Sequence, residues 1–227
     1  MGHSSGTVNN HQANYLAQFY RDFQVESRIL LTGHSHQAWP DHAKSGLMRA
    51  WSDAAEHVDR KWEFAFEKAE KVKQAYAQML NDRKGSIALA SSSHDLLVRF
   101  LSALPLKSRP KLITSDCEFY SLQRQLKRLG EAGLDVHWVQ AQPPELVAEK
   151  VVKLIDCKTA AVLVSSVFYN TGLRMTHWQA IVAACERVGA QLLIDAYHQI
   201  NVVPFDIEAL GLQQAFILGG GYKYCQF

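Results

Sequence analysis

Two apolar runs, AAVLV at residues 160–164 and QLLI at residues 191–194, decide the fold. The first is followed by Ser165 and the second by Asp195. Continuous apolar runs without polar alternation are typical of strands that are buried on both faces, as the central strands of a parallel sheet are. The two runs therefore predict central strands of such a sheet, each with a polar residue at its carboxyl end.

From about residue 85 onward, the chain around these runs alternates between short apolar runs and segments with helical spacing. This alternation is typical of an α/β protein whose parallel sheet is covered by helices on both faces. We predict strands at 86–90, 111–115, 135–139, 160–165, 191–195 and 215–218, and helices at 93–104, 120–132, 144–156 and 176–188.

The first part of the chain has a different pattern. Apolar residues at helical spacing predict a helix over about 12–28, and a loop follows it. A long helical region then covers about 41–80, with a break near 58–59. We predict that residues 1–40 form an N-terminal helix and a loop that borders the active site, and that residues 41–227 form one large domain.

Composition excludes several classes of protein. The chain has 227 residues, of which 48% are hydrophobic and 20% charged, as in an ordinary globular domain. The net charge is only +2 and the sequence has no basic run, so nothing in it indicates a basic surface that would bind nucleic acid. No apolar run is long enough to span a membrane, and the N-terminus has no apolar signal core. We therefore expect a cytoplasmic protein.

The cysteines and histidines do not predict a metal site. The four cysteines are scattered and form no paired motif: Cys117, Cys157, Cys185 and Cys225. Reduced thiols are the expectation for a cytoplasmic protein. Three histidines cluster loosely, without a carboxylate or cysteine at ligand spacing: His34, His36 and His42. We predict no bound metal.

Polar residues at the ends of predicted strands are candidate site residues, because open α/β sheets bind ligands beyond the carboxyl ends of their strands. Ser165 is polar, although an apolar residue would be expected at the end of a central strand. Asp195 must be paired or solvated, since burying a lone carboxylate is costly. It therefore caps a helix, forms an ion pair or faces a cationic group of a ligand. His198, three residues later, either orients a ligand or is a half-buried loop histidine.

Three further candidates follow earlier strands. Ser91 and Ser92 precede the predicted helix 93–104, so they either cap that helix or contribute to a phosphate site at its N-terminus. Phe119 follows the strand 111–115 and either stacks on a planar ligand or belongs to the core.

A glycine-rich turn, GGGYK at residues 219–223, follows the last predicted strand and ends in Lys223. It lacks the spacing of a nucleotide-binding loop, which makes a nucleotide-binding domain the weakest interpretation. A strand-end aspartate and a strand-end lysine are what a pyridoxal phosphate (PLP) enzyme needs. The lysine forms a Schiff base with the cofactor aldehyde, and the aspartate pairs with the protonated ring nitrogen. Tyr222 can donate its hydroxyl to the phosphate.

These residues resemble the cofactor signature of kynureninase, a member of the class V aminotransferase-like group of fold type I PLP enzymes. The resemblance rests on Asp195-x-x-His198, on Tyr222-Lys223 and on the segment 165–172. It implies a fold type I sheet flanked by helices, with PLP as the cofactor and Lys223 as the catalytic residue. It implies that the cofactor is bound by Ser91, Ser92, Phe119, Ser165, Asp195, His198, Tyr222 and Lys223.

The resemblance also implies an activity. A kynureninase-like enzyme cleaves the Cβ–Cγ bond of a 3-acyl-alanine by hydrolysis, and members of the fold act as homodimers. The segment after Phe119 lacks the family's usual proline and acidic residue, so the substrate stays open. Cysteine desulfurases usually have histidines where this chain has Phe119 and Tyr222, which argues against a desulfurase.

Family members continue well beyond their lysine, so we expect that this chain is the N-terminal half of such an enzyme and that the C-terminal small domain is missing. A class V aminotransferase, a lyase acting on another amino acid, and a non-catalytic truncated paralogue remain the alternatives.

Overall fold

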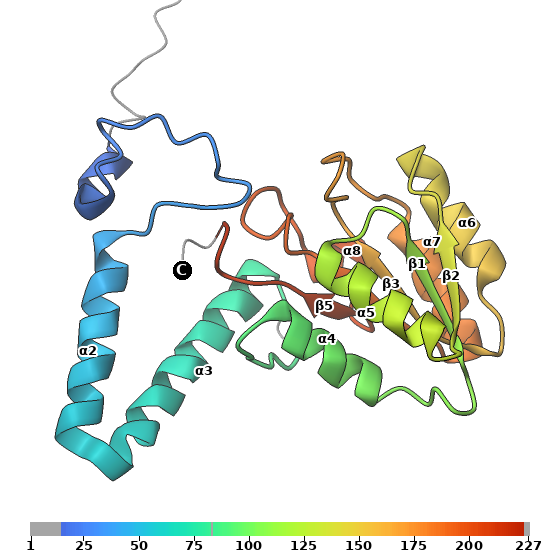
Figure 1. The fold of residues 1–227 in the computed structure, drawn as a ribbon, viewed down its shortest axis with the longest axis horizontal. Coiled ribbons are helices and arrows are strands. Elements are labelled where there is room, and N and C mark those ends of the chain that lie inside the picture. The colour runs from blue at the N-terminus through green and yellow to red at the C-terminus, as the bar shows by residue number, and fades with distance from the viewer. Residues whose placement is uncertain (1–14, 83, 225–227) are drawn as a thin grey trace, which may run out of the picture. The chain divides into compact units, whose positions relative to one another are not determined.

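The computed structural model describes residues 15–82 and 84–224, which form two compact units (Figure 1). The first unit comprises the described residues up to Lys68 together with 221–224, and the second comprises the described residues of Ala69–Gly220. Each unit is described by itself below.

Two long helices dominate the first unit. Helix α2 spans Asp41–His57, and α3 begins at Lys61 and extends to Met79, which lies in the second unit. The break between them falls at Val58, whose φ of 35° no α-helix accommodates. The prediction of a long helical region that breaks near 58–59 is therefore confirmed.

The predicted helix over 12–28 is wrong for the residues that are described. Two short 3₁₀ helices, Leu16–Phe19 and Arg21–Phe23, stand in its place, and Gln24 adopts a left-handed conformation after them. The apolar side chains that suggested a helix, such as Leu16, stay exposed. An amphipathic helix is stabilised mainly by packing its apolar face, and this segment does not bury that face.

The second unit contains a five-stranded parallel sheet in the order β2-β1-β3-β4-β5. Its strands are β1 (Lys111–Ser115), β2 (Asp135–Val139), β3 (Thr159–Ser165), β4 (Gln191–Asp195) and β5 (Phe216–Leu218). Every residue of β3 is buried and so is every residue of β4 after Gln191, as the two apolar runs predicted for central strands; every residue of β1 is buried as well.

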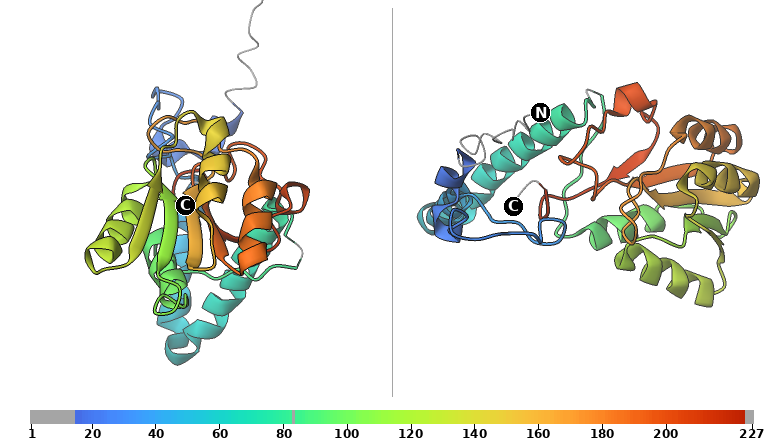
Figure 2. Two further views of the ribbon diagram at one scale, coloured as in Figure 1. Left: turned by 90° about the vertical axis from the view of Figure 1, so that its right-hand side faces the viewer. Right: turned by 90° about the horizontal axis from the view of Figure 1, so that it is seen from above.

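Helices cover both faces of this sheet (Figure 2, left). Helices α4 (Ser93–Ser102) and α5 (Tyr120–Glu131) pack together on one face, and α6 (Val147–Leu154) and α7 (Trp178–Val188) pack on the other. The short α8 (Ile207–Leu210) was not predicted. The α/β fold class with a mainly parallel, helix-flanked sheet is therefore confirmed. Leucines dominate the core under α4 and α5: Leu97, Leu101, Leu112, Leu122, Leu126, Leu163, Leu193 and Leu218.

The predicted strand at 86–90 is wrong, because these residues form no ladder with any described strand. Their apolar side chains are poorly covered, and that of Leu89 is 40% exposed. A strand gains its stability from cross-strand pairs and from burial of a face, and this segment has neither among the described residues.

No helix in the described part of the chain is long and apolar enough to cross a membrane.

Candidate active site

The carboxyl ends of the parallel strands bring two predicted site residues together. Ser165 ends β3 and pairs in register with Asp195, which ends β4. The Ser166 N–H donates to the Asp195 carbonyl (2.9 Å), and the Ala196 N–H donates to the Leu218 carbonyl at the end of β5 (2.8 Å). Two polar side chains that were far apart in the sequence therefore lie side by side on one edge of the sheet.

Asp195 is held by its own turn. The Tyr197 N–H donates to the Asp195 Oδ1 at 3.0 Å, and the residue is only 8% exposed. This bond fixes the carboxyl group in one orientation at the sheet edge. A charged group positioned in this way can pair with a cationic ligand atom that approaches the edge.

Phe119 and His198 meet through a third aromatic side chain. The ring of Tyr169 lies 5.1 Å from that of Phe119 and 5.7 Å from that of His198, with edge-to-face geometry in both pairs. The Tyr120 ring also contacts Tyr169, at 5.7 Å. Sequence reasoning placed Tyr169 in the segment 165–172 but did not select it as a site residue. A tyrosine just past a polar strand end was the available signal.

Ser92 acts as a helix cap. Its Oγ accepts a hydrogen bond from the Asp95 N–H (3.2 Å) at the N-terminus of α4. Ser91 and Ser92 are both exposed, and the described contacts do not join them to the aromatic cluster. The capping interpretation of Ser92 is thus confirmed, while the binding of a phosphate there stays a prediction.

Glu118 is the residue that sequence reasoning missed. It lies just after β1, is 1% exposed, and sits between two strand-end serines. Ser115 Oγ lies 2.5 Å from Glu118 Oε1, the Ser165 N–H donates to the same oxygen at 3.1 Å, and Ser165 Oγ contacts Oε2. Burial, with a smaller contribution from the nearby Asp195, raises the pKa of Glu118 to about 7, although the hydrogen bonds from Ser115 and Ser165 lower it.

One more polar atom is buried at this edge. Ser166 Oγ has no hydrogen-bond partner among the described residues, although the side chain is fully buried. Buried hydroxyls are normally satisfied, so this atom marks unused hydrogen-bonding capacity beside Ser165.

Two glycines after β5 lie in close contact with side chains of the loop that follows Asp195. A Cβ on Gly219 would lie 2.4 Å from Ile200 Cδ1, and a Cβ on Gly220 would lie 2.3 Å from the Tyr197 ring. Distances this short are not tolerated between carbon atoms. The glycine-rich turn therefore lets the chain pass directly against the loop that follows Asp195.

We expect Gly220→Ala to destabilise the protein by about 1–3 kcal/mol, because the new methyl group collides with the Tyr197 ring. Gly46→Ala on α2 is the matched control: apart from its chain neighbours and the backbone of its own helix, nothing lies within 4 Å of its Cβ position, so we expect it to be neutral or stabilising by up to about 1 kcal/mol. Denaturant unfolding of both variants checks this. Equal stability of the two variants would contradict the packing argument.

Tyr222 and Lys223 belong to the first unit. The Tyr222 hydroxyl lies 3.2 Å from His36 Nδ1, and the two rings meet edge to face at 6.1 Å. The loop predicted to border the active site therefore contacts the residue next to Lys223. The pairing of Lys223 with a group bound at Asp195 stays a prediction from the sequence.

Among the described residues, no group of three or more histidine, cysteine, aspartate or glutamate side chains is placed to hold a metal ion. Cys185 is buried in α7, and burial raises the pKa of its thiol to about 12. Cys225 lies outside the described residues.

The sequence matches a known family. The chain belongs to the aminotransferase class-V family, which it matches over residues 49–225, and this family uses PLP. An uncharacterized aminotransferase of Bacillus subtilis (strain 168), YcbU, is 22% identical over 212 residues, which cover 92% of this chain and 56% of YcbU.

Solved structures agree on the fold. A C-DES mutant with glycine covalently linked to its PLP cofactor has a TM-score of 0.75 and 15% identity, covering 91% of this chain and 55% of that one. The cystine C-S lyase C-DES in complex with its product cysteine persulfide has a TM-score of 0.72 and 17% identity, covering 85% and 52%. The chain thus spans about half the length of these relatives.

Proposed function

We propose that the chain supplies the cofactor site of a PLP-dependent enzyme that acts on an amino acid. The observation that carries the proposal is the pairing of buried Ser165 and Asp195 at the sheet edge of a class-V aminotransferase family member.

The side chains present fit PLP. The Asp195 carboxylate suits a protonated ring nitrogen, and the aromatic cluster of Phe119, Tyr169 and His198 suits contact with a planar ring. The orphaned Ser166 hydroxyl offers a further hydrogen bond at the same edge. The exposed N-terminus of α4 at Ser91 and Ser92 suits a phosphate group.

Two residues of the glycine-rich turn complete the proposed site. Lys223 would hold the cofactor covalently and, once released, move a proton to or from the substrate. Tyr222 would donate its hydroxyl to the phosphate, with His36 orienting it. When bound, the cofactor supplies an electron sink for the bond that is broken in the amino acid.

The reaction that we propose is kynureninase-like hydrolysis of the Cβ–Cγ bond of a 3-acyl-alanine. The sequence signature of Asp195, His198, Tyr222 and Lys223 supports it. Transamination, or a lyase reaction on another amino acid, would use the same cofactor residues. The named activity of C-DES as a cystine C-S lyase makes cystine a substrate to include in the test.

Purified protein supplied with PLP tests the proposal. We expect a visible absorbance band from lysine-bound cofactor and release of alanine from kynurenine. Turnover of cystine instead would replace the hydrolase assignment by a lyase. Amino transfer to a 2-oxo acid would replace it by an aminotransferase. Failure to bind PLP would overturn the whole proposal and favour a non-catalytic paralogue.

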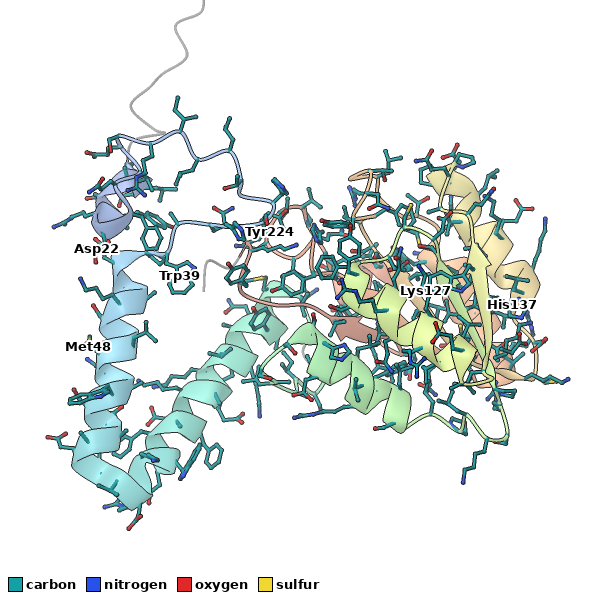
Figure 3. The ribbon with its side chains drawn as sticks, in the orientation of Figure 1. Asp22, Trp39, Met48, Lys127, His137 and Tyr224 are labelled. Carbon is teal, nitrogen blue, oxygen red and sulfur yellow. The ribbon has the colours of Figure 1, made fainter. Side chains whose placement is uncertain are left out.

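We further propose that the protein forms a homodimer. Large apolar side chains stay exposed on α2 and on the first part of α3, and Figure 3 labels one of them, Met48. Exposed apolar patches of this kind mark interaction surfaces. The side chains are Leu47, Met48, Trp51, Trp62 and Phe66.

We expect Trp51→Glu to convert the dimer to a monomer, because it puts a charge where a 70% exposed indole would be buried by the partner copy. Light scattering after size exclusion measures the mass. Leu146→Glu, the same kind of change at an exposed residue between β2 and α6, should leave the mass unchanged. A monomeric wild-type chain would contradict the dimer.

A further inference from the structure

The carboxyl group of Glu118 is surrounded by hydrogen-bonding hydroxyls. It lies in the core between β1 and β3, and no lysine, arginine or histidine is among its described partners. Titratable groups near it are Asp195 on β4 and Cys117 on its own loop. The pKa of the Cys117 thiol is itself raised, chiefly by burial. An uncompensated carboxylate in such a place favours its neutral form.

The hydrogen bonds decide where the proton of a neutral Glu118 resides. Oε1 already accepts from the Ser165 N–H and faces Ser115 Oγ, which in turn accepts from the Cys117 N–H at 3.3 Å. A proton on Oε1 would leave that oxygen less able to accept from the Ser165 N–H and would require Ser115 Oγ to accept a second hydrogen bond in place of donating one. Oε2, in contrast, is in contact with the Ser165 hydroxyl, which can either donate or accept. The proton therefore belongs on Oε2, where it points at Ser165 Oγ.

The protonation state of Glu118 decides whether the Ser165 hydroxyl donates to it or accepts from it. The heavy-atom contact between Ser165 Oγ and Oε2 is the same whichever oxygen holds the hydrogen. When Glu118 is ionised, the single Ser165 hydroxyl proton points to the carboxylate. When Glu118 is neutral, Ser165 accepts its proton, and the Ser165 hydroxyl is free to donate elsewhere.

We propose that Glu118 is a positioning residue that, as a neutral acid, donates to Ser165 and so makes the Ser165 hydroxyl a hydrogen-bond donor toward the bound cofactor. This inference rests on the proposed function, because Ser165 lies in register with Asp195 at the proposed ring site. A neutral Glu118 also avoids a second negative charge beside Asp195.

Glu118→Gln is the central variant. A glutamine of the same shape can place its amide oxygen at the Oε1 position and its NH₂ group at the Oε2 position. It then donates to Ser165 at every pH and copies the neutral acid. The Glu118 pKa is about 7. We therefore expect the affinity of the wild-type protein for PLP to weaken about fivefold as the pH rises through 7. A fivefold loss corresponds to roughly one hydrogen bond. Glu118→Gln should lose this transition.

Two further variants make the result specific. Ser165→Ala removes the hydroxyl and should also lose the transition, even if Glu118→Gln fails to fold. Asp116→Asn, a neighbouring carboxyl whose Oδ1 accepts from the Ala141 N–H, should keep it. A transition that persists unchanged in Glu118→Gln or in Ser165→Ala would overturn the proposal.

A measurement on the cofactor-free protein tests the protonation of Glu118 separately from PLP binding. Infrared difference spectra of the cofactor-free protein, recorded below and above the Glu118 pKa, should show the carbonyl stretch of a buried neutral acid that Glu118→Gln lacks. If no variant binds PLP, the proposed function fails while this spectrum still locates the proton. If PLP binds but the infrared signal is absent or survives in Glu118→Gln, the inference on Glu118 fails alone.

Discussion

Lys223→Ala abolishes the visible absorbance of lysine-bound PLP and lowers turnover by about 10²–10⁴-fold, the range expected when a positioned proton-transfer group is removed. The expectation follows from the proposed double role of Lys223, as covalent anchor and as the base that serves the substrate. Absorbance titration with PLP and steady-state kinetics measure the two losses separately. A small primary amine in the buffer should restore part of the proton transfer.

Lys127→Ala is the control for this prediction. Lys127 is an exposed lysine on α5, labelled in Figure 3, and its loss should leave both readouts unchanged. Borohydride reduction followed by peptide mapping identifies the modified lysine directly. Reduced cofactor on a lysine other than Lys223, or an absorbance band that persists in Lys223→Ala, would overturn the assignment.

Asp195→Asn weakens PLP binding by about 5- to 10-fold, because a charge-assisted hydrogen bond worth about 1.5–3 kcal/mol becomes a neutral one worth about 0.5–1.5 kcal/mol. The asparagine oxygen can still accept from the Tyr197 N–H, so the turn after β4 should keep its shape. The substitution therefore separates the charge of Asp195 from its structural bond. Turnover should fall as well, since the ring is no longer held protonated as an electron sink.

Asp195→Ala completes this series. It removes both the charge and the bond to Tyr197, so it should lower the stability of the protein, whereas Asp195→Asn should not. Fluorescence titration of PLP and thermal unfolding of both variants measure the two effects. Wild-type affinity in Asp195→Asn would show that the ring nitrogen does not depend on this carboxylate.

The sheet could be predicted from the sequence because its signals are local. The bounds of β1, β2 and β4 agree with the predicted strands, and β3 and β5 differ by one residue at their starts. A continuous apolar run indicates a strand that is buried on both faces, and neighbouring parallel strands have their carboxyl ends on the same edge of the sheet. The grouping of Ser165 with Asp195 follows from that rule.

The predictions that failed depend on neighbours that sequence patterns do not contain. The segment 86–90 has the composition of a strand but finds no ladder among the described residues. The segment after Tyr15 has helical spacing, but Leu16 and Phe19, two of the side chains that would form the apolar face, stay exposed. Glu118 looks like a surface acid in the sequence, and its burial is visible only when β1 and β3 lie side by side.

The sequence by itself determined the parallel sheet, the strand-end candidates and the glycine-lysine turn, because hydrophobic period and residue chemistry are properties of short segments. Only the tertiary structure decided that Tyr169 joins Phe119 to His198, that Gly220 packs against the Tyr197 ring, and that a buried Glu118 links Ser115 to Ser165. These contacts join residues from different strands and loops. They depend on desolvation and side-chain packing, which arise only when the strands assemble.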